Sequence, residues 1–115
     1  MPFKRRFITL LKNGNVKDGN EIYGKWKKFN GAYIVAYGYG MDGYTMDLIY
    51  KNRCYTLCSG CDIYVNGLNF HEPLYLDDIV SFNSASQTLT ISKNNNKYEI
   101  KLSSIYGGGQ KVSWY

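Results

Sequence analysis

Several features that are scarce or missing in the sequence argue against a helical, membrane-spanning or secreted protein. Alanine, the best helix former, is scarce, and no segment repeats its apolar residues at the spacing of an amphipathic helix. No run approaches the roughly 18 consecutive apolar residues that a transmembrane helix needs, so we expect no membrane partner. The opening MPFKRRFITLLKNG lacks the long apolar region and small-residue cleavage site of a signal peptide, and we expect none.

Cysteine is also sparse. The chain has 3 cysteines, an odd number that cannot form a closed disulfide framework. A reducing, intracellular setting is the simplest interpretation. We therefore expect the protein in the cytoplasm, or in a virion if its source is viral.

The residues that are abundant favour strands and turns. The chain contains 12 Tyr and 12 Gly but only 2 Pro, and it is rich in Asn. Asn-Gly pairs, which are typical of tight hairpin turns, stand at 13–14, 30–31 and 66–67. Asp18-Gly19 and Asp42-Gly43 are related signals, and KNNNK at 93–97 predicts a further turn. We expect a single all-β domain over 1–115, built as a β-sandwich or a partly open small barrel.

Short runs between these turns define the expected strands. They lie near 3–11, 22–29, 32–39, 44–50, 53–58, 63–65, 68–70, 79–82, 87–92 and 97–102, with a last one in KVSWY. The GGG at 107–109 is expected to be a flexible loop before that last strand.

The spacing C-x3-C-x2-C in CYTLCSGC, residues 54–61, raises the question of a metal. It matches the iron–sulfur ligands of radical S-adenosylmethionine enzymes, but this chain is too short for their barrel, and Gly60 stands where an aromatic residue is usual. A zinc site completed by His71 is a second alternative. In a strand, Cys54, Thr56 and Cys58 share one face, and Cys54 and Cys58 lie about 13 Å apart, too far for one metal. We expect neither metal nor cofactor.

Positive charge gathers at the start of the chain. Residues 1–28 contain eight basic and two acidic side chains, so they carry a charge of +6 within a chain total of +5. This asymmetry suits an acidic protein or a nucleic acid as partner. The expected anionic-partner face comprises Lys4, Arg5, Arg6, Lys25, Lys27 and Lys28. In a strand, Lys25 and Lys27 share one face while Trp26 and Lys28 share the other.

Residues 46–82 resemble the C-terminal half of a forkhead-associated domain. The resemblance depends on three segments: Tyr64-Val65-Asn66-Gly67, Glu72-Pro73-Leu74 and the closing segment 76–82, in which Asp77 replaces the family's favoured Gly. The resemblance implies a β-sandwich that binds peptides through its loops.

The phosphothreonine-reading residues of that family are missing here. Residues 43–46 (Gly, Tyr, Thr, Met) occupy the place of its Ser-Arg-x-His stretch, and no clear Gly-Arg pair lies upstream. Cys61 and Asp62 replace its Asn-Gly, with Ser59 retained. The resemblance therefore implies a degenerate domain that binds without reading phosphothreonine.

The leading hypothesis is a non-enzymatic protein-interaction module. The loops at one end of the sandwich would form its binding surface, and the partner would be another protein. The expected loop residues are Asp42, Tyr44, Thr45, Ser59, Cys61 and Asp62, with the NSAS turn at 83–86. No nucleophile–His arrangement, carboxylate pair or phosphate loop stands out, so we expect no catalytic residues.

Two alternatives stay open. One is a small basic nucleic-acid-binding barrel, in which Tyr33, Tyr37, Tyr39 or Tyr44 would stack on bases, although alternating tyrosines more often pack in a core. The other is a structural or accessory protein of a phage or other virus.

Overall fold

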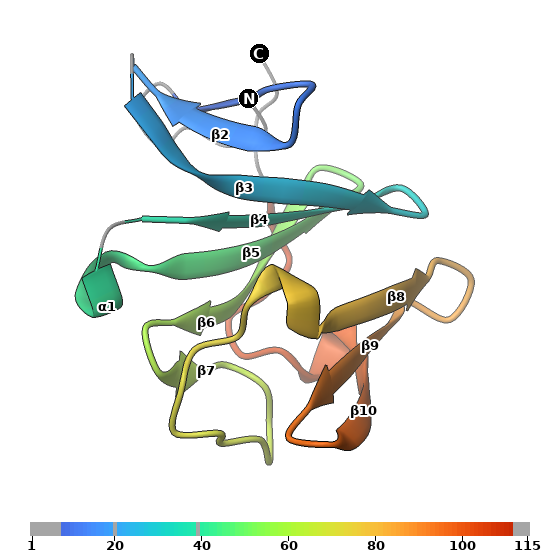
Figure 1. Ribbon diagram of the computed structural model, residues 1–115. Helices are drawn as coiled ribbons and strands as arrows, with labels where there is room; N and C mark the ends of the chain where they lie inside the picture. Colours follow the sequence, from blue (N-terminus) through green and yellow to red (C-terminus); the bar gives the residue numbers. More distant parts are fainter. Residues whose placement is uncertain (1–7, 20, 39, 112–115) are drawn as a thin grey trace.

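The computed structural model describes residues 8–19, 21–38 and 40–111 and consists mostly of short strands (Figure 1). The all-β class predicted from the sequence is confirmed. The elements are β1 (Ile8–Leu10), β2 (Asn15–Asp18), β3 (Glu21–Phe29), β4 (Ala32–Tyr37), α1 (Gly40–Gly43), β5 (Thr45–Tyr50), β6 (Arg53–Ser59), β7 (Asp62–Ile63), η1 (Leu76–Asp78), β8 (Ile79–Asn83), β9 (Thr88–Lys93), β10 (Asn96–Lys101), η2 (Leu102–Ser104) and β11 (Gln110–Lys111).

The strands form two antiparallel sheets. The larger has the order β1-β2-β3-β4-β5-β6-β11, with β7 also paired to β6, and it curls into a half-barrel. The smaller has the order β10-β9-β8. The main core joins the two sheets, since it combines residues such as Leu48 and Leu57 with Phe82, Leu89 and Ile91.

Asn-rich turns connect neighbouring strands as predicted. Asn30-Gly31 and Asn94-Asn95 each join two paired strands with positive φ at both residues, which is the type I′ geometry that Asn and Gly tolerate best. Lys51-Asn52 does the same between β5 and β6. Asp42-Gly43 differs from expectation, because both residues lie in the single helical turn α1.

The strand predicted at 68–70 is wrong. Asn66-Gly67 forms a turn, closed by the N–H of Leu68 donating to the carbonyl of Val65 (3.1 Å), but an irregular loop follows it. Leu68 and Phe70 pack against the main core from this loop. Their apolar side chains serve core packing, and none of the strands that the structure describes is paired with them.

β4 is buried on both faces, so the protein has a second, smaller core. Ile34 and Ala36 face the main core, whereas Val35 and Tyr37 pack with Val16 and Ile49. Val16 belongs to β2, so the curled edge of the larger sheet folds back over β4 and β5. The preference for alternating tyrosines as core residues is confirmed for Tyr37, which is 3% exposed.

A bulge in β6 overturns the prediction that Cys54 and Cys58 share a face. Met46 pairs with Cys58 and Asp47 with Thr56, so Leu57 is an extra residue in the ladder. Leu57 and Cys58 both enter the main core, while Cys54 packs against the second core. A single inserted residue moves every side chain beyond it to the other face.

The glycine-rich loop at 107–109 is fastened to β6. The N–H of Gly109 donates to the carbonyl of Cys54 (2.8 Å), and Arg53 Nη1 donates to the carbonyl of Gly109 (2.7 Å). Its flexibility stays a prediction. The last expected strand, KVSWY at 111–115, begins within β11 (Gln110–Lys111), and its residues 112–115 lie outside the described residues.

Candidate functional site

The predicted partner-binding loops gather at one end of the larger sheet, which we call the β6–β7 end. Thr45 pairs with Ser59, Ser59 pairs with Asp62, and the N–H of Gly60 donates to the carbonyl of Tyr44 (2.8 Å). The structure thus brings Thr45, Ser59 and Asp62 together as expected. Asp42 lies next to them along the chain, in α1, and its side chain is outside the described ones.

Tyr44 is engaged in the fold. Its hydroxyl donates to the carbonyl of Leu74 (2.6 Å), and its ring lies 6.0 Å from that of Tyr75. Burial, with the nearby groups of Cys58 and Tyr75, raises the pKa of the Tyr44 phenol. Cys61, Asp62 and Tyr75 are exposed at this end, whereas the side chains of Tyr44, Thr45 and Ser59 are partly enclosed by the fold.

The NSAS turn at 83–86 does not join this end, so its grouping with the other loops is wrong. Asn30 Nδ2 donates to the carbonyl of Phe82 (2.7 Å), which places the end of β8 beside the β3–β4 turn (Figure 1). The turn itself is closed by Asn83, whose Oδ1 accepts from the N–H groups of Ala85 and Ser86. We call this opposite end of the larger sheet the β3–β4 end.

The cysteines do not converge. Cys54 is half-buried, Cys58 is buried and Cys61 is exposed, and burial raises the pKa of the Cys58 thiol. Within residues 8–19, 21–38 and 40–111, no three His, Cys, Asp or Glu side chains are grouped as a metal ion requires. His71 is exposed, in a turn where its φ is +58°.

The basic residues of β3 lie as predicted. Lys25 and Lys27 are paired with Ala36 and Ile34, and Trp26 and Lys28 are paired with Val35 and Tyr33. All three lysines are exposed. Lys4, Arg5 and Arg6 lie outside the described residues.

Trp26 is held in place by the fold. Its indole packs against the second core, its ring lies 5.8 Å from that of Tyr33, and its Nε1 donates to the carbonyl of Leu11 (2.7 Å). The Nζ of Lys28 lies 5.1 Å from the centre of the Tyr33 ring. Both aromatic rings are therefore partly covered by neighbours.

A groove of about 620 Å³ opens beside this part of β3, and we call it the basic groove. It is bordered by the β1–β2 turn, the last residues of β3 and the first residues of β8. Its lining residues are Lys12, Asn13, Gly14, Trp26, Lys27, Lys28, Phe29, Ile79 and Val80. The sequence singles out Trp26, Lys27 and Lys28 but not the walls formed by the β1–β2 turn and β8, because these segments are far apart in the chain.

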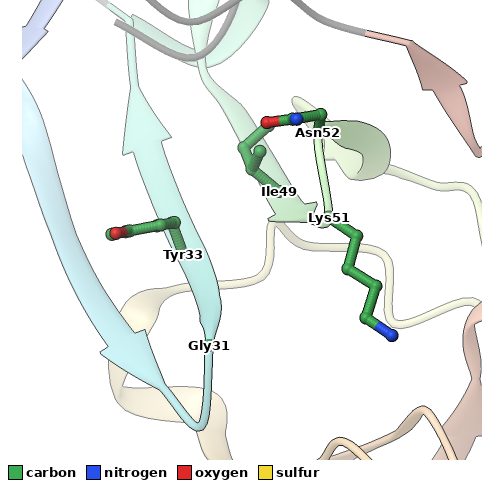
Figure 2. A pocket seen from close by; sticks show the side chains of 5 residues that line it. All are labelled: Gly31, Tyr33, Ile49, Lys51 and Asn52. Carbon is green, nitrogen blue, oxygen red and sulfur yellow. The ribbon is translucent and has the colours of Figure 1, made fainter.

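A smaller depression of about 270 Å³ lies at the same end (Figure 2). It is lined by Gly31, Tyr33, Ile49, Lys51 and Asn52. Figure 2 shows Tyr33 and Lys51 pointing in different directions, and the Nζ of Lys51 lies 5.3 Å from the ring centre of Tyr50. Its polar groups do not converge on a common point, so it is the weaker candidate.

Lys93 is a buried charge that sequence reasoning placed in a polar turn. Its side chain is 4% exposed, and its Nζ lies 2.8 Å from Asp78 Oδ2 and 2.9 Å from Glu72 Oε1. Burial alone would lower the pKa of Lys93, but the hydrogen bonds to Asp78 and Glu72 outweigh it and raise that pKa. The pairing with two carboxylates makes Lys93 a structural residue.

Comparison with protein-family models, curated proteins and solved structures found no significant match. Among the described residues, no helix is long and apolar enough to cross a membrane.

Proposed function

We propose that this protein is a non-enzymatic interaction module that binds an acidic segment of another protein through the basic groove. The observation that carries the proposal is that Lys12, Lys27 and Lys28 all line one groove, with Lys27 and Lys28 on the two faces of the same strand end. None of the described lining residues is acidic. Such a surface attracts anionic partners from a distance and selects against cationic ones.

The lysines of the groove are available for a partner. Lys27 makes one ion pair, with Asp77, at 3.7 Å between two exposed side chains, and such pairs contribute little to stability. An incoming carboxylate can replace Asp77 at small cost. Lys27 and Lys28 lie in the part of β3 that is paired with β4, Gly24–Phe29, so the positions of their Cα atoms are fixed before binding.

A protein segment fits the groove better than a nucleic acid. Proteins that bind single strands stack bases on open aromatic faces, whereas Trp26 and Tyr33 already pack against each other. The other groove walls include Phe29, Ile79 and Val80, which suit aliphatic side chains. The experiment therefore tests a nucleic acid as the alternative ligand of the groove.

The experiment compares charge reversal in the groove with charge reversal elsewhere. The double variant Lys27→Glu, Lys28→Glu should weaken binding of a Glu-rich peptide by about thirtyfold, measured by calorimetry at low salt. The matched control is Lys97→Glu, Lys101→Glu, which reverses two exposed lysines on β10. Equal losses in both double variants would show that net charge, not the groove, governs binding.

A single-stranded oligonucleotide is titrated in parallel. Binding of the oligonucleotide without binding of the peptide would replace this proposal by the nucleic-acid alternative. The forkhead-associated resemblance of 46–82 stays a hypothesis about ancestry, and the basic groove does not depend on it.

A further inference from the structure

β3 is longer than the strand beside it. The ladder between β2 and β3 runs from Asp18–Glu21 to Asn15–Lys25, and the N–H of Trp26 makes a last bond to the carbonyl of Gly14 (2.9 Å). There the chain turns away into the β1–β2 turn, where the N–H of Gly14 donates to the carbonyl of Leu11. In the described register, residues 27–29 therefore pair with β4 alone.

The open side of β3 displays the main-chain groups of Lys28. Phe29 and Ala32 flank a two-residue turn, so they form a hydrogen-bonded pair, and Phe29 and Lys27 direct their peptide groups toward β4. Alternate residues point the other way, as the bond from Trp26 to Gly14 demonstrates. The N–H and C=O of Lys28 thus face the side on which the basic groove lies.

The opposite wall of the groove is also a strand edge. β8 is the terminal strand of the smaller sheet, and its Ile79 and Val80 line the groove. Val80 is 44% exposed. The hydrogen bond from Asn30 to the carbonyl of Phe82 links the two walls at their far end. The groove therefore runs between two strand edges that belong to different sheets.

Lysines at an open edge deter pairing with a second copy of the same chain. Two identical edges that each carry Lys27 and Lys28 repel one another, which is how natural sheets avoid aggregation. The same charges favour an edge partner that is acidic. The charge of the groove thus selects an acidic strand of another protein as its occupant.

We propose that the acidic partner segment binds in extended form and adds a short strand to β3 beside Lys28. Its main chain pairs with the N–H and C=O of Lys28, and its carboxylates lie near Lys12, Lys27 and Lys28. This inference rests on the proposed function and specifies the conformation of the bound segment. Because one residue offers both groups, about two main-chain hydrogen bonds form.

The experiment uses the wild-type chain, isotope-labelled for amide exchange, and a short peptide of alternating glutamate and threonine. The comparison peptide has the same sequence with methylated backbone nitrogens, so it keeps its charge but cannot donate to a strand. We expect the unmodified peptide to slow exchange of the Lys28 amide by about tenfold or more. The methylated peptide should bind about tenfold more weakly.

Three results would contradict strand addition, and the first of them separates it from the proposed function. Equal binding of both peptides, with no protection of the Lys28 amide and with loss of binding in Lys27→Glu, Lys28→Glu, would overturn strand addition and leave the proposed function standing. Protection at amides of the β6–β7 end in place of Lys28 would overturn both the groove and the strand. Failure of the unmodified peptide to bind at low salt would also count against both.

Discussion

The two ends of the larger sheet differ in how their residues are used. At the β6–β7 end, the loop residues bond to one another and to the core, as Tyr44 does with Leu74. At the β3–β4 end, strands of unequal length leave a groove, which Lys12, Lys27 and Lys28 help to line. The difference therefore moves the proposed binding site from the polar loops to the end at which the strand ladder is incomplete.

Segment 72–78 connects the two ends. Tyr75 packs on Tyr44 at one end, and η1 leads directly into β8, which forms a groove wall at the other. Lys93 fastens this segment, because its Nζ is paired with Glu72 and Asp78 and lies 5.0 Å from the ring centre of Tyr75. Changes at Lys93 should therefore affect both ends, and changes at Tyr44 only one.

The largest effect is expected for Lys93→Met. The variant leaves the carboxylate of Asp78, which is 18% exposed on its side chain, without its cation. We expect a loss of about 3 kcal/mol in the free energy of unfolding, measured with urea, and weaker peptide binding in the groove. The control Lys97→Met, at an exposed position of β10, should change stability by less than about 0.5 kcal/mol. Similar losses in both variants would contradict the special role of Lys93.

Alkaline pH should destabilise the fold through the same segment. The folded pKa values of Lys93 and Tyr44 are both raised, so the folded state holds these protons more tightly than the unfolded chain does. Their stabilisation is complete below about pH 10 and is lost as the pH rises above it. Urea titrations across this range should show the decline, and it should be smaller in Lys93→Met and in Tyr44→Phe. An equal decline in all three proteins would assign it to other groups.

A smaller effect is expected for Tyr44→Phe. The change removes the hydroxyl that donates to the carbonyl of Leu74 and keeps the ring. We expect a loss of about 1 kcal/mol, or a melting temperature about 4 °C lower, with peptide binding in the groove unchanged. The matched control is Tyr106→Phe, whose exposed hydroxyl donates to Asn66 Oδ1 (2.8 Å) and should matter less. Loss of peptide binding in Tyr44→Phe would show that the two ends are coupled.

The sequence predicts what depends on neighbours along the chain. Asn30-Gly31 and Asn94-Asn95 form the expected turns because positive φ is a local preference. The faces of Lys25 and Trp26 follow from strand alternation over a regular ladder. Predictions failed where the outcome depends on distant segments, as in the bulge at Leu57, which appears only in the register with β5, and in the loop at 68–70, where Leu68 and Phe70 pack against the main core.

The groove could be predicted only in part. Lys27 and Lys28 indicate a basic strand. No pattern in the neighbouring sequence indicates that the pairing of β2 with β3 stops at Lys25, or that β8 forms the opposite wall of the groove. Lys93 shows the same limit, because KNNN predicts the turn correctly while the burial of its first residue depends on Glu72 and Asp78. Distant segments decide which polar side chains are enclosed.

The smallest effect is expected at the β6–β7 end, where phosphorylation of a partner peptide should not change its affinity. Asp62 is exposed beside Ser59, in the ladder position that the forkhead-associated resemblance assigns to phosphate recognition. Its carboxylate repels a phosphate. We expect phosphothreonine peptides to bind no better there than their unphosphorylated forms, as measured by titration.

Asp62→Asn removes the repulsion without adding a cation, so it should still yield no phospho-dependent binding. The matched change at the other end is Lys28→Gln, which removes one cation from the basic groove and should reduce the binding of any phosphate that enters there. A phospho-dependent complex that survives Lys28→Gln and is lost on Ser59→Ala would reverse the comparison, because the β6–β7 end would then be the binding site and the groove only a charged surface.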